Sequence, residues 1–161
     1  MKNTVKKFCI SILILSVGFN ALSVGKIGNY DLLGDGQMKL YSYYEKGATQ
    51  LEYNSMSGKY VEFFENGAIW EKGSWNTKHL VGQHISYYEN ENLRHELHYN
   101  NEGLKEGLQK YYHSNGKLSM KGHWVNGKVN GTLVRYDKEG NITSVINYDA
   151  GKIIKRIYPT N

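Results

Sequence analysis

Histidines are the first residues of this chain to weigh for chemistry, because an imidazole can bind a metal ion or move a proton. The chain has six, which are His79, His84, His95, His98, His113 and His123. His95 and His98 are three residues apart, and an odd spacing on a strand directs two side chains to opposite faces. They cannot chelate one ion as a helical pair does. We therefore predict no metal site.

Serines and carboxylates are the other candidates for catalysis. A nucleophilic serine needs a base and an orienting acid, and the chain has no Gly-x-Ser-x-Gly elbow. Two carboxylates can hydrolyse a glycoside only across a cleft, and a flat sheet of hairpins offers none. The serines and acidic pairs considered are Ser86, Ser114, Ser119, Glu62 with Glu65, and Glu89 with Glu91. We predict that the protein is not an enzyme, with no catalytic residue and no cofactor.

Aromatic residues carry the remaining chemistry, which is binding. Tyrosine occurs 14 times and aromatic residues make up 13% of the chain. Adjacent aromatic pairs place one ring on each face of a strand. We predict that Phe63, Tyr87 and Tyr111 share one face and form a candidate partner-binding surface, since aromatic rings are enriched at protein interfaces. The same rings also stack on sugars, so a carbohydrate or lipid ligand stays open.

The aromatic pairs recur because the chain is built from repeats. An opening glycine appears as Gly58, Gly82, Gly107 and Gly131, at intervals of 24, 25 and 24 residues. A large aromatic residue closes each unit, as Trp75, Tyr99, Trp124 and Tyr148. A fixed period of this length indicates units that complete each other's core. We therefore predict that the four closing aromatics are core residues.

Each unit has the pattern of a β-hairpin. In the unit that begins at Gly107, an aromatic pair ends one strand, Asn115-Gly116 turns the chain, and residues 118–124 alternate apolar and polar. Asn-Gly is typical of a type I′ hairpin turn. We predict an all-β protein, a repeat array of antiparallel β-hairpins that forms an extended meander sheet. The repeat domain spans 38–158, with units at about 38–57, 58–81, 82–106, 107–130 and 131–155.

The second strand of each unit indicates which face is inside. Its first apolar residue and its closing aromatic are six residues apart, so alternation places both on the core face. The first apolar residues are Ile69, Leu93, Leu118 and Ile142. In each unit we expect an aromatic residue to end the first strand, and these residues are Phe64, Tyr88, Tyr112 and Tyr136.

Residues 1–23 have the pattern of a secretory signal peptide. Lys2, Lys6 and Lys7 precede an apolar run at 8–19, and small residues follow at 21–23. This pattern predicts export to the periplasm, the cell surface or the medium, with a mature chain that begins near Val24. We expect residues 24–37 to form a linker or an irregular first strand.

The charge of the chain argues against a nucleic-acid partner. The net charge is +5, but residues 24–161 hold 17 basic and 15 acidic residues. Nucleic-acid binding needs a concentrated basic face. The basic stretch at 152–156 fits an edge strand protected by lysines.

These motifs resemble those of a known repeat family. Over about 38–155 the chain resembles the MORN-repeat variant family. The resemblance rests on three motifs in a fixed order, which are Tyr-Tyr-x-x-Asn-Gly-x-Leu, Gly-x-Trp/Tyr and Asn-Gly-Lys-x-x-Gly. It departs at Asn90-Glu91-Asn92, where the turn glycine is missing. In bacteria the family includes antitoxin-like repeat proteins of the YwqK type. The resemblance implies a scaffold that binds another protein, with an antitoxin or immunity role; a module that binds cell-envelope carbohydrate or lipid is the alternative.

Overall fold

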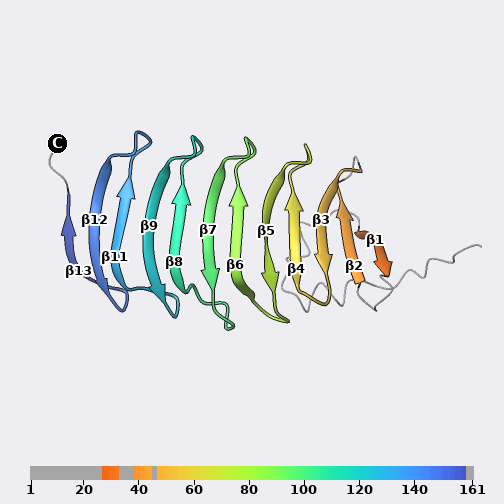
Figure 1. The fold of residues 1–161 in the computed structure, drawn as a ribbon, viewed down its shortest axis with the longest axis horizontal. Helices are drawn as coiled ribbons and strands as arrows, with labels where there is room; N and C mark the ends of the chain where they lie inside the picture. The colour runs from red at the N-terminus through yellow and green to blue at the C-terminus, as the bar shows by residue number, and fades with distance from the viewer. Residues whose placement is uncertain (1–26, 33–37, 45–46, 159–161) are drawn as a thin grey trace, which may run out of the picture.

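The computed structural model describes residues 27–32, 38–44 and 47–158. In this part of the chain all regular structure is β, and the strands form one antiparallel sheet in chain order. Figure 1 shows the strands side by side from β1 at one end to β13 at the other. The predicted all-β meander is therefore confirmed. The expected signal peptide at 1–23 lies outside the described residues.

Thirteen strands make up the sheet, and each pairs with the next except around β10. The short β10 pairs only with β9, so β9 is followed by β11 in the order of the sheet. The strands are β1 (Ile27–Leu32), β2 (Met38–Tyr43), β3 (Thr49–Asn54), β4 (Lys59–Phe63), β5 (Ile69–Trp75), β6 (Leu80–Tyr87), β7 (Leu93–Tyr99), β8 (Gly107–Tyr112), β9 (Leu118–Val125), β10 (Lys128–Val129), β11 (Gly131–Tyr136), β12 (Ile142–Asp149) and β13 (Lys152–Ile157).

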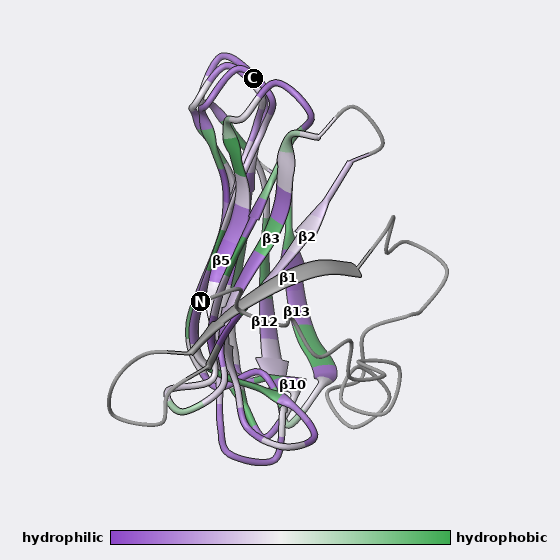
Figure 2. Ribbon diagram, turned by 90° about the vertical axis from the view of Figure 1, so that its right-hand side faces the viewer, coloured by the Kyte–Doolittle hydropathy of each residue, from purple (hydrophilic) through white to green (hydrophobic). Residues whose placement is uncertain are grey.

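The sheet is a single, gently bent layer. Viewed along the row of strands, the ribbons overlap, and no second layer lies over either face of the described strands (Figure 2). One face, called the core face below, carries a central row of side chains that the strand register aligns. The row is Tyr60, Gly73, His84, Leu97, Gln109, Gly122, Leu133 and Ile146. Every non-glycine member is buried. The opposite face is called the second face.

Two glycines let the core-face side chains pack closely. A Cβ atom at Gly122 would lie 3.0 Å from Cζ3 of Trp124. One at Gly73 would lie 3.2 Å from Cε1 of Tyr60 and 3.2 Å from Cδ2 of His84. The close contacts show why large rings can alternate with glycine along a single layer, since interiors are packed to high density.

The hairpin turns are of two kinds. Asn126 and Gly127 both have positive φ, 47° and 78°, as a type I′ turn requires. At Asn115-Gly116 only the glycine has positive φ, 83°. The Gly116 N–H donates to the His113 carbonyl at 2.9 Å, and the His113 N–H donates to the Lys117 carbonyl at 2.8 Å. The prediction of a type I′ turn here is wrong, because this is a three-residue loop with a left-handed glycine.

A register shift of one residue lies in the strands beside this three-residue loop. The shift falls at the same place in the hairpins, between Glu62 and Phe63, Ser86 and Tyr87, and Tyr111 and Tyr112, and in two others. The residue that ends the first strand therefore pairs with the first apolar residue of the second strand. These pairs are Phe63–Ile69, Tyr87–Leu93, Tyr112–Leu118 and Tyr136–Ile142.

Two expectations are overturned, the first by this register shift and the second by the unequal spacing of the units. The first apolar residues of the return strands lie on the second face with their partners, and Ile69 and Ile142 are 37% and 45% exposed. The strand-ending aromatics are Phe63 and Tyr87, not Phe64 and Tyr88. The cause is that the extra residue of the 25-residue interval lies between Tyr99 and Gly107, outside the hairpin.

The opening glycines recur for a backbone reason. Gly58, Gly82, Gly107 and Gly131 have φ of 65°, 67°, 75° and 87°, which disfavours any residue with a Cβ. At Gly58 a Cβ would also lie 1.9 Å from the Trp75 carbonyl oxygen. The repeated glycine thus ends each connection between hairpins in a conformation that the next strand needs.

A substitution at Glu91 can test the role of the left-handed turn position. It has φ of 64° at the place that Gly67, Gly116 and Gly140 take in other hairpins. Because a non-glycine residue pays roughly 1–2 kcal/mol in this conformation, we expect Glu91→Gly to raise the free energy of unfolding by about 1 kcal/mol. Chemical denaturation would measure it. Glu102→Gly, in an exposed turn without positive φ, is the control and should give no gain.

Candidate binding faces of the sheet

The centre of the core face holds a buried polar group on β4, β5 and β6. The Tyr60 hydroxyl donates to Oε1 of Glu71 at 3.0 Å, and Nε2 of His84 lies 3.4 Å from the same oxygen. Nδ1 of His84 and the Ser86 hydroxyl are buried with no hydrogen-bond partner in the described part of the chain. Buried polar atoms usually have a partner, so this region is the least satisfied part of the core.

Next to the central row, on the side of the three-residue turns, lies a second row that we call the turn-side row. It runs Glu62, Glu71, Ser86, His95, Tyr111, Met120, Arg135 and Ser144 through directly paired positions. Two carboxylates stand at one end and a guanidinium stands near the other. The row is therefore strongly asymmetric in charge.

The two carboxylates are directly opposite each other on β4 and β5. Burial, and then the charge of Glu71, raise the pKa of Glu62 to about 7. Burial also acts to raise the pKa of Glu71, but hydrogen bonds from His84 and Tyr60 outweigh it and leave that pKa below its usual value. Like charges at directly opposite positions destabilise a sheet, so Glu62 carries the cost of this pair.

The middle of the turn-side row is aromatic. The rings of His95 and Tyr111 meet edge to face with centroids 5.0 Å apart. Burial, and then the nearby Arg94 charge, lower the pKa of His95 to about 4, so its ring is neutral at neutral pH. Lys105 donates to the Tyr111 hydroxyl and lies 5.3 Å from the centre of the Tyr111 ring.

Gln109 joins β7 to β8 in place of backbone pairing. Its side chain accepts from the His98 N–H at 3.0 Å and donates to the carbonyls of His98 at 3.0 Å and Glu106 at 2.9 Å. It is 0% exposed. Backbone pairing between these strands is limited to two residue pairs. Sequence reasoning missed Gln109, although it is the one amide at a position taken by Tyr60, His84 and Leu133 in other units.

The second face is more open. Lys72 lies 5.6 Å from the Tyr87 ring centre, and Glu96 accepts from Lys110 and Tyr112, each at 2.9 Å. The hydrogen bond from Lys110 lowers the pKa of Glu96. Burial acts to raise this pKa, and the hydrogen bond from Tyr112 acts to lower it further.

Two large apolar side chains are exposed on the same face, near the ends of the strands opposite to the three-residue turns. Leu108 on β8 is 45% exposed and Val125 on β9 is 37% exposed. Leu108 pairs with His123, so Val125, two residues further along β9, lies on the same face.

The candidate partner-binding residues do not form one column. Phe63 and Tyr87 follow the core-face residues Glu62 and Ser86 and therefore point to the second face. Tyr111 is aligned with Ser86 through His95 and lies on the core face. Phe63, Tyr87 and Tyr111 are all half-buried. The expectation that the three share a face is wrong for Tyr111, because the 25-residue interval from Gly82 to Gly107 makes Tyr111 equivalent to Ser86 and not to Tyr87.

The predicted core aromatics lie where alternation places them, but they are not equally covered. Trp124 is buried, at 8% exposure. The other three, Trp75, Tyr99 and Tyr148, are half-buried. They flank the central row on the side away from the three-residue turns, where only the neighbouring units cover them.

The residue after each strand-ending aromatic links neighbouring units. The Tyr88 hydroxyl donates to the Tyr112 carbonyl at 2.8 Å, and the Tyr44 hydroxyl donates to the Phe63 carbonyl at 2.7 Å. His113 occupies the same place, with Nε2 3.0 Å from the Tyr136 carbonyl. Aromatic pairs therefore occur for a structural reason as well.

Turn asparagines add a second link between units. The Asn90 amide donates to the Ser114 carbonyl at 2.9 Å, and the Asn115 amide donates to the Lys138 carbonyl at 2.8 Å. Each bond joins a turn to the equivalent turn of the next unit. Neighbouring hairpins are therefore fixed at their turns as well as through their strands.

Within the described residues no group of three or more His, Cys, Asp or Glu side chains is arranged to hold a metal ion. The same residues include no helix long and apolar enough to cross a membrane. What the described faces offer is side chains for binding: an asymmetric charged row on one side and an apolar patch on the other.

Comparison with protein families agrees with the repeat geometry. The model for the MORN repeat variant matches residues 56–76, 80–101 and 105–126. These three segments are therefore similar to MORN repeat variants. Each match spans one hairpin, namely β4–β5, β6–β7 and β8–β9. No curated protein matches the chain.

A substitution at Phe64 can test the hydroxyl link between neighbouring units. It holds the place of Tyr44 and Tyr88 but has no hydroxyl, and its ring lies 6.3 Å from that of Trp70. We expect Phe64→Tyr to bond to the Tyr87 carbonyl and raise the free energy of unfolding by about 0.5–1.5 kcal/mol, the usual net value of such a bond. Tyr88→Phe should lower it by a similar amount. Equal midpoints for both variants and the wild type in urea would show that the link contributes nothing.

Glu62 gives a prediction in pH. Its pKa is raised in the folded state to about 7, so the unfolded chain loses this proton at lower pH than the folded one. The folded state is then penalised as pH rises toward 7, and the full penalty remains above it. At protein concentrations low enough for the chain to be a single copy, we expect Glu62→Gln to be more stable than wild type at pH 8 by about 2 kcal/mol, after allowance for solvent screening. The gain should largely disappear at pH 4.

Thermal unfolding at the two pH values checks this result. Glu89→Gln, which removes an exposed carboxylate, is the control. A gain for Glu62→Gln that is the same at pH 4 and pH 8 would contradict the assignment.

Proposed function

We propose that this protein is a non-catalytic, exported repeat scaffold that binds another protein through its second face. The observation that carries the proposal is the pair of exposed apolar side chains, Leu108 and Val125, on an uncovered face of a single-layer sheet. Exposed apolar side chains that lie together mark interaction sites more often than isolated ones do.

The surroundings of this pair suit a protein partner. Toward the turns the same face presents the half-buried rings of Tyr87 and Tyr112, and polar side chains such as His98 and His123 surround the pair. An apolar centre with tyrosines and a polar rim is the usual anatomy of a protein interface. Phe63 and Tyr87 belong to this surface, whereas Tyr111 belongs to the core face.

The MORN repeat variants in 56–126 support a binding scaffold of this kind. Together with the signal-peptide pattern of residues 1–23, the antitoxin-like resemblance favours an immunity role outside the cytoplasm. N-terminal sequencing of the native protein should then return a residue near Val24. A soluble cytoplasmic protein that begins at Met1 would contradict export.

Binding of a cell-envelope carbohydrate or lipid is the second candidate. It predicts equivalent sites in every unit. The positions equivalent to Leu108 are Lys59, Gln83 and Thr132, and those equivalent to Val125 are Asn76, Asn100 and Asp149. The apolar pair therefore occurs in one unit alone, which favours a single protein partner over a repeated small ligand.

The test is affinity capture with the full chain expressed, with a C-terminal tag, in its own cells. We expect wild type to retain one specific protein, and Leu108→Ser with Val125→Ser to lose it without a change in melting temperature. Met56→Ser, at an exposed loop residue, is the matched control and should retain it. Equal capture by the double variant would overturn the proposed surface, and retention of purified envelope glycan or lipid instead would favour the second candidate.

A further inference from the structure

The two carboxylates of the turn-side row have no lysine or arginine partner in the described part of the chain. Glu62 and Glu71 face each other across β4 and β5. The group within ion-pair distance of Glu71 is His84, which is charged only when protonated. Two opposed and half-buried carboxylates would be stabilised by a cation, and this region of the core face provides none.

Arg135 has the converse arrangement. It is exposed on β11 and aligned with Met120 and Ser144 on the core face. It makes no hydrogen bond, ion pair or ring contact with any described residue, and it borders an open hollow of about 400 Å³ that Tyr111 also lines. A guanidinium keeps its charge at all physiological pH values and suits carboxylate partners.

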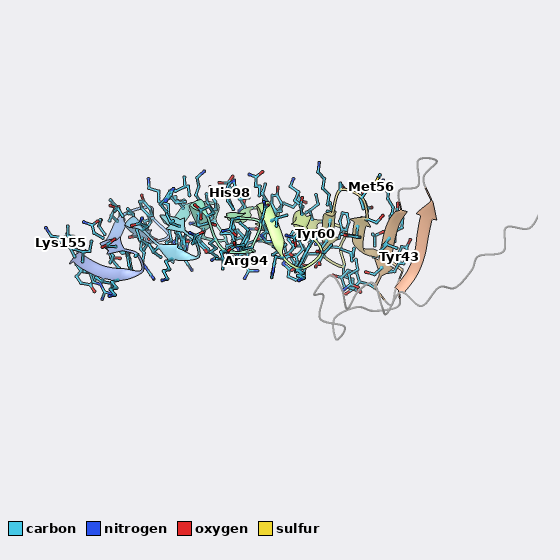
Figure 3. The ribbon with its side chains drawn as sticks, turned by 90° about the horizontal axis from the view of Figure 1, so that it is seen from below. Tyr43, Met56, Tyr60, Arg94, His98 and Lys155 are labelled. Atoms are coloured by element: carbon cyan, nitrogen blue, oxygen red, sulfur yellow. The ribbon has the colours of Figure 1, made fainter. Side chains whose placement is uncertain are left out.

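Other cations near the core face already have partners. The Lys105 ammonium group donates a hydrogen bond to the Tyr111 hydroxyl. The Arg94 guanidinium, on the opposite side of the sheet from His98 (Figure 3), lies 5.7 Å from the centre of the Tyr88 ring. Arg156 donates to the Tyr158 hydroxyl at 3.1 Å. Among the described residues, Arg135 is therefore the cation of this face that an outside carboxylate can reach without displacing an existing contact.

We propose that two copies of the protein pack core face to core face with their strand orders reversed, so that Arg135 of each copy lies against Glu62 and Glu71 of the other. In the order of the sheet, β11 is six strands from β4 and five from β5. A two-fold axis parallel to the strands at β7–β8 brings these positions together. The same axis keeps both turn-side rows at the same end of the dimer.

The centre of this arrangement suits a contact between identical surfaces. A two-fold axis at β7–β8 passes near the His95 and Tyr111 rings, and a residue at such an axis meets its own copy. His95 is neutral at neutral pH, so two copies do not repel each other there. Facing sheets lie about 10 Å apart with nearly aligned strands. A second copy would therefore supply the missing second layer.

A second copy explains the charge pattern better than a different protein does. One end of the turn-side row has carboxylates without a cation, and the other end has a guanidinium without an anion. The core face is therefore complementary in charge to a second copy whose strand order is reversed. The inference concerns the core face, whereas the proposed protein partner binds the second face. The two can therefore fail independently: Leu108→Ser with Val125→Ser should leave the mass in solution unchanged.

Sedimentation equilibrium of the full chain as purified from cells tests the proposal. Wild type should have twice the mass of one chain, and Arg135→Glu should raise the dimer dissociation constant by about tenfold or more, since like charges brought together cost several kcal/mol. Glu62→Arg combined with Arg135→Glu should restore much of the affinity. Lys121→Glu, an exposed cation of the second face, is the control and should remain dimeric.

A cysteine cross-link tests the position of the axis. In a Cys9→Ser background, which removes the only native cysteine, His95→Cys should form a disulfide between chains on mild oxidation. His98→Cys on the second face should not. A monomeric wild type, an Arg135→Glu variant that dimerises normally, or cross-linking through His98→Cys in place of His95→Cys would each overturn the proposal.

Discussion

The sheet depends on one row of side chains, because no second layer covers it in the described part of the chain. Tyr60, Leu97, Leu133 and Ile146 are each at most 5% exposed although they lie on a single layer. They reach this burial by packing along the sheet, between neighbours on adjacent strands. Each hairpin is therefore stabilised by the hairpins beside it, as in other repeat proteins.

The register shift beside each three-residue turn decides which residues of the second strand enter that row. The shift places the first residue of the second strand opposite the residue that ends the first strand, and both then lie on the second face. Without the shift, Ile69 and Ile142 would fall on the core face and Phe63 would not pair with Ile69. Glu91, which takes φ of 64° without a glycine, shows that the turn conformation is kept even where it is costly.

The all-β class, the meander and the hairpin positions could be predicted from the sequence, because glycine and aromatic spacing report the repeat directly. The face of Tyr111 follows from the 25-residue interval between Gly82 and Gly107, and it is missed when Phe63, Tyr87 and Tyr111 are counted at equal steps of 24 residues. Gln109 and the Glu62–Glu71 pair were beyond prediction. Their roles depend on which strand lies opposite, and a single sequence shows neighbours along the chain but not across the sheet.

The positions that repeat and those that vary have different roles in this molecule. Glycine or an aromatic residue recurs where backbone conformation or core packing leaves little choice, as at Gly58 and Trp75. The proposed binding residues stand where the units differ: Leu108, Val125 and Arg135 have no like residue at the equivalent places of other units. In a repeat scaffold, a site that recognises one partner in one orientation has to be built from such positions, because a fully repeated surface would bind equally well in several registers. The asymmetric row on the core face and the single apolar pair on the second face both satisfy that condition.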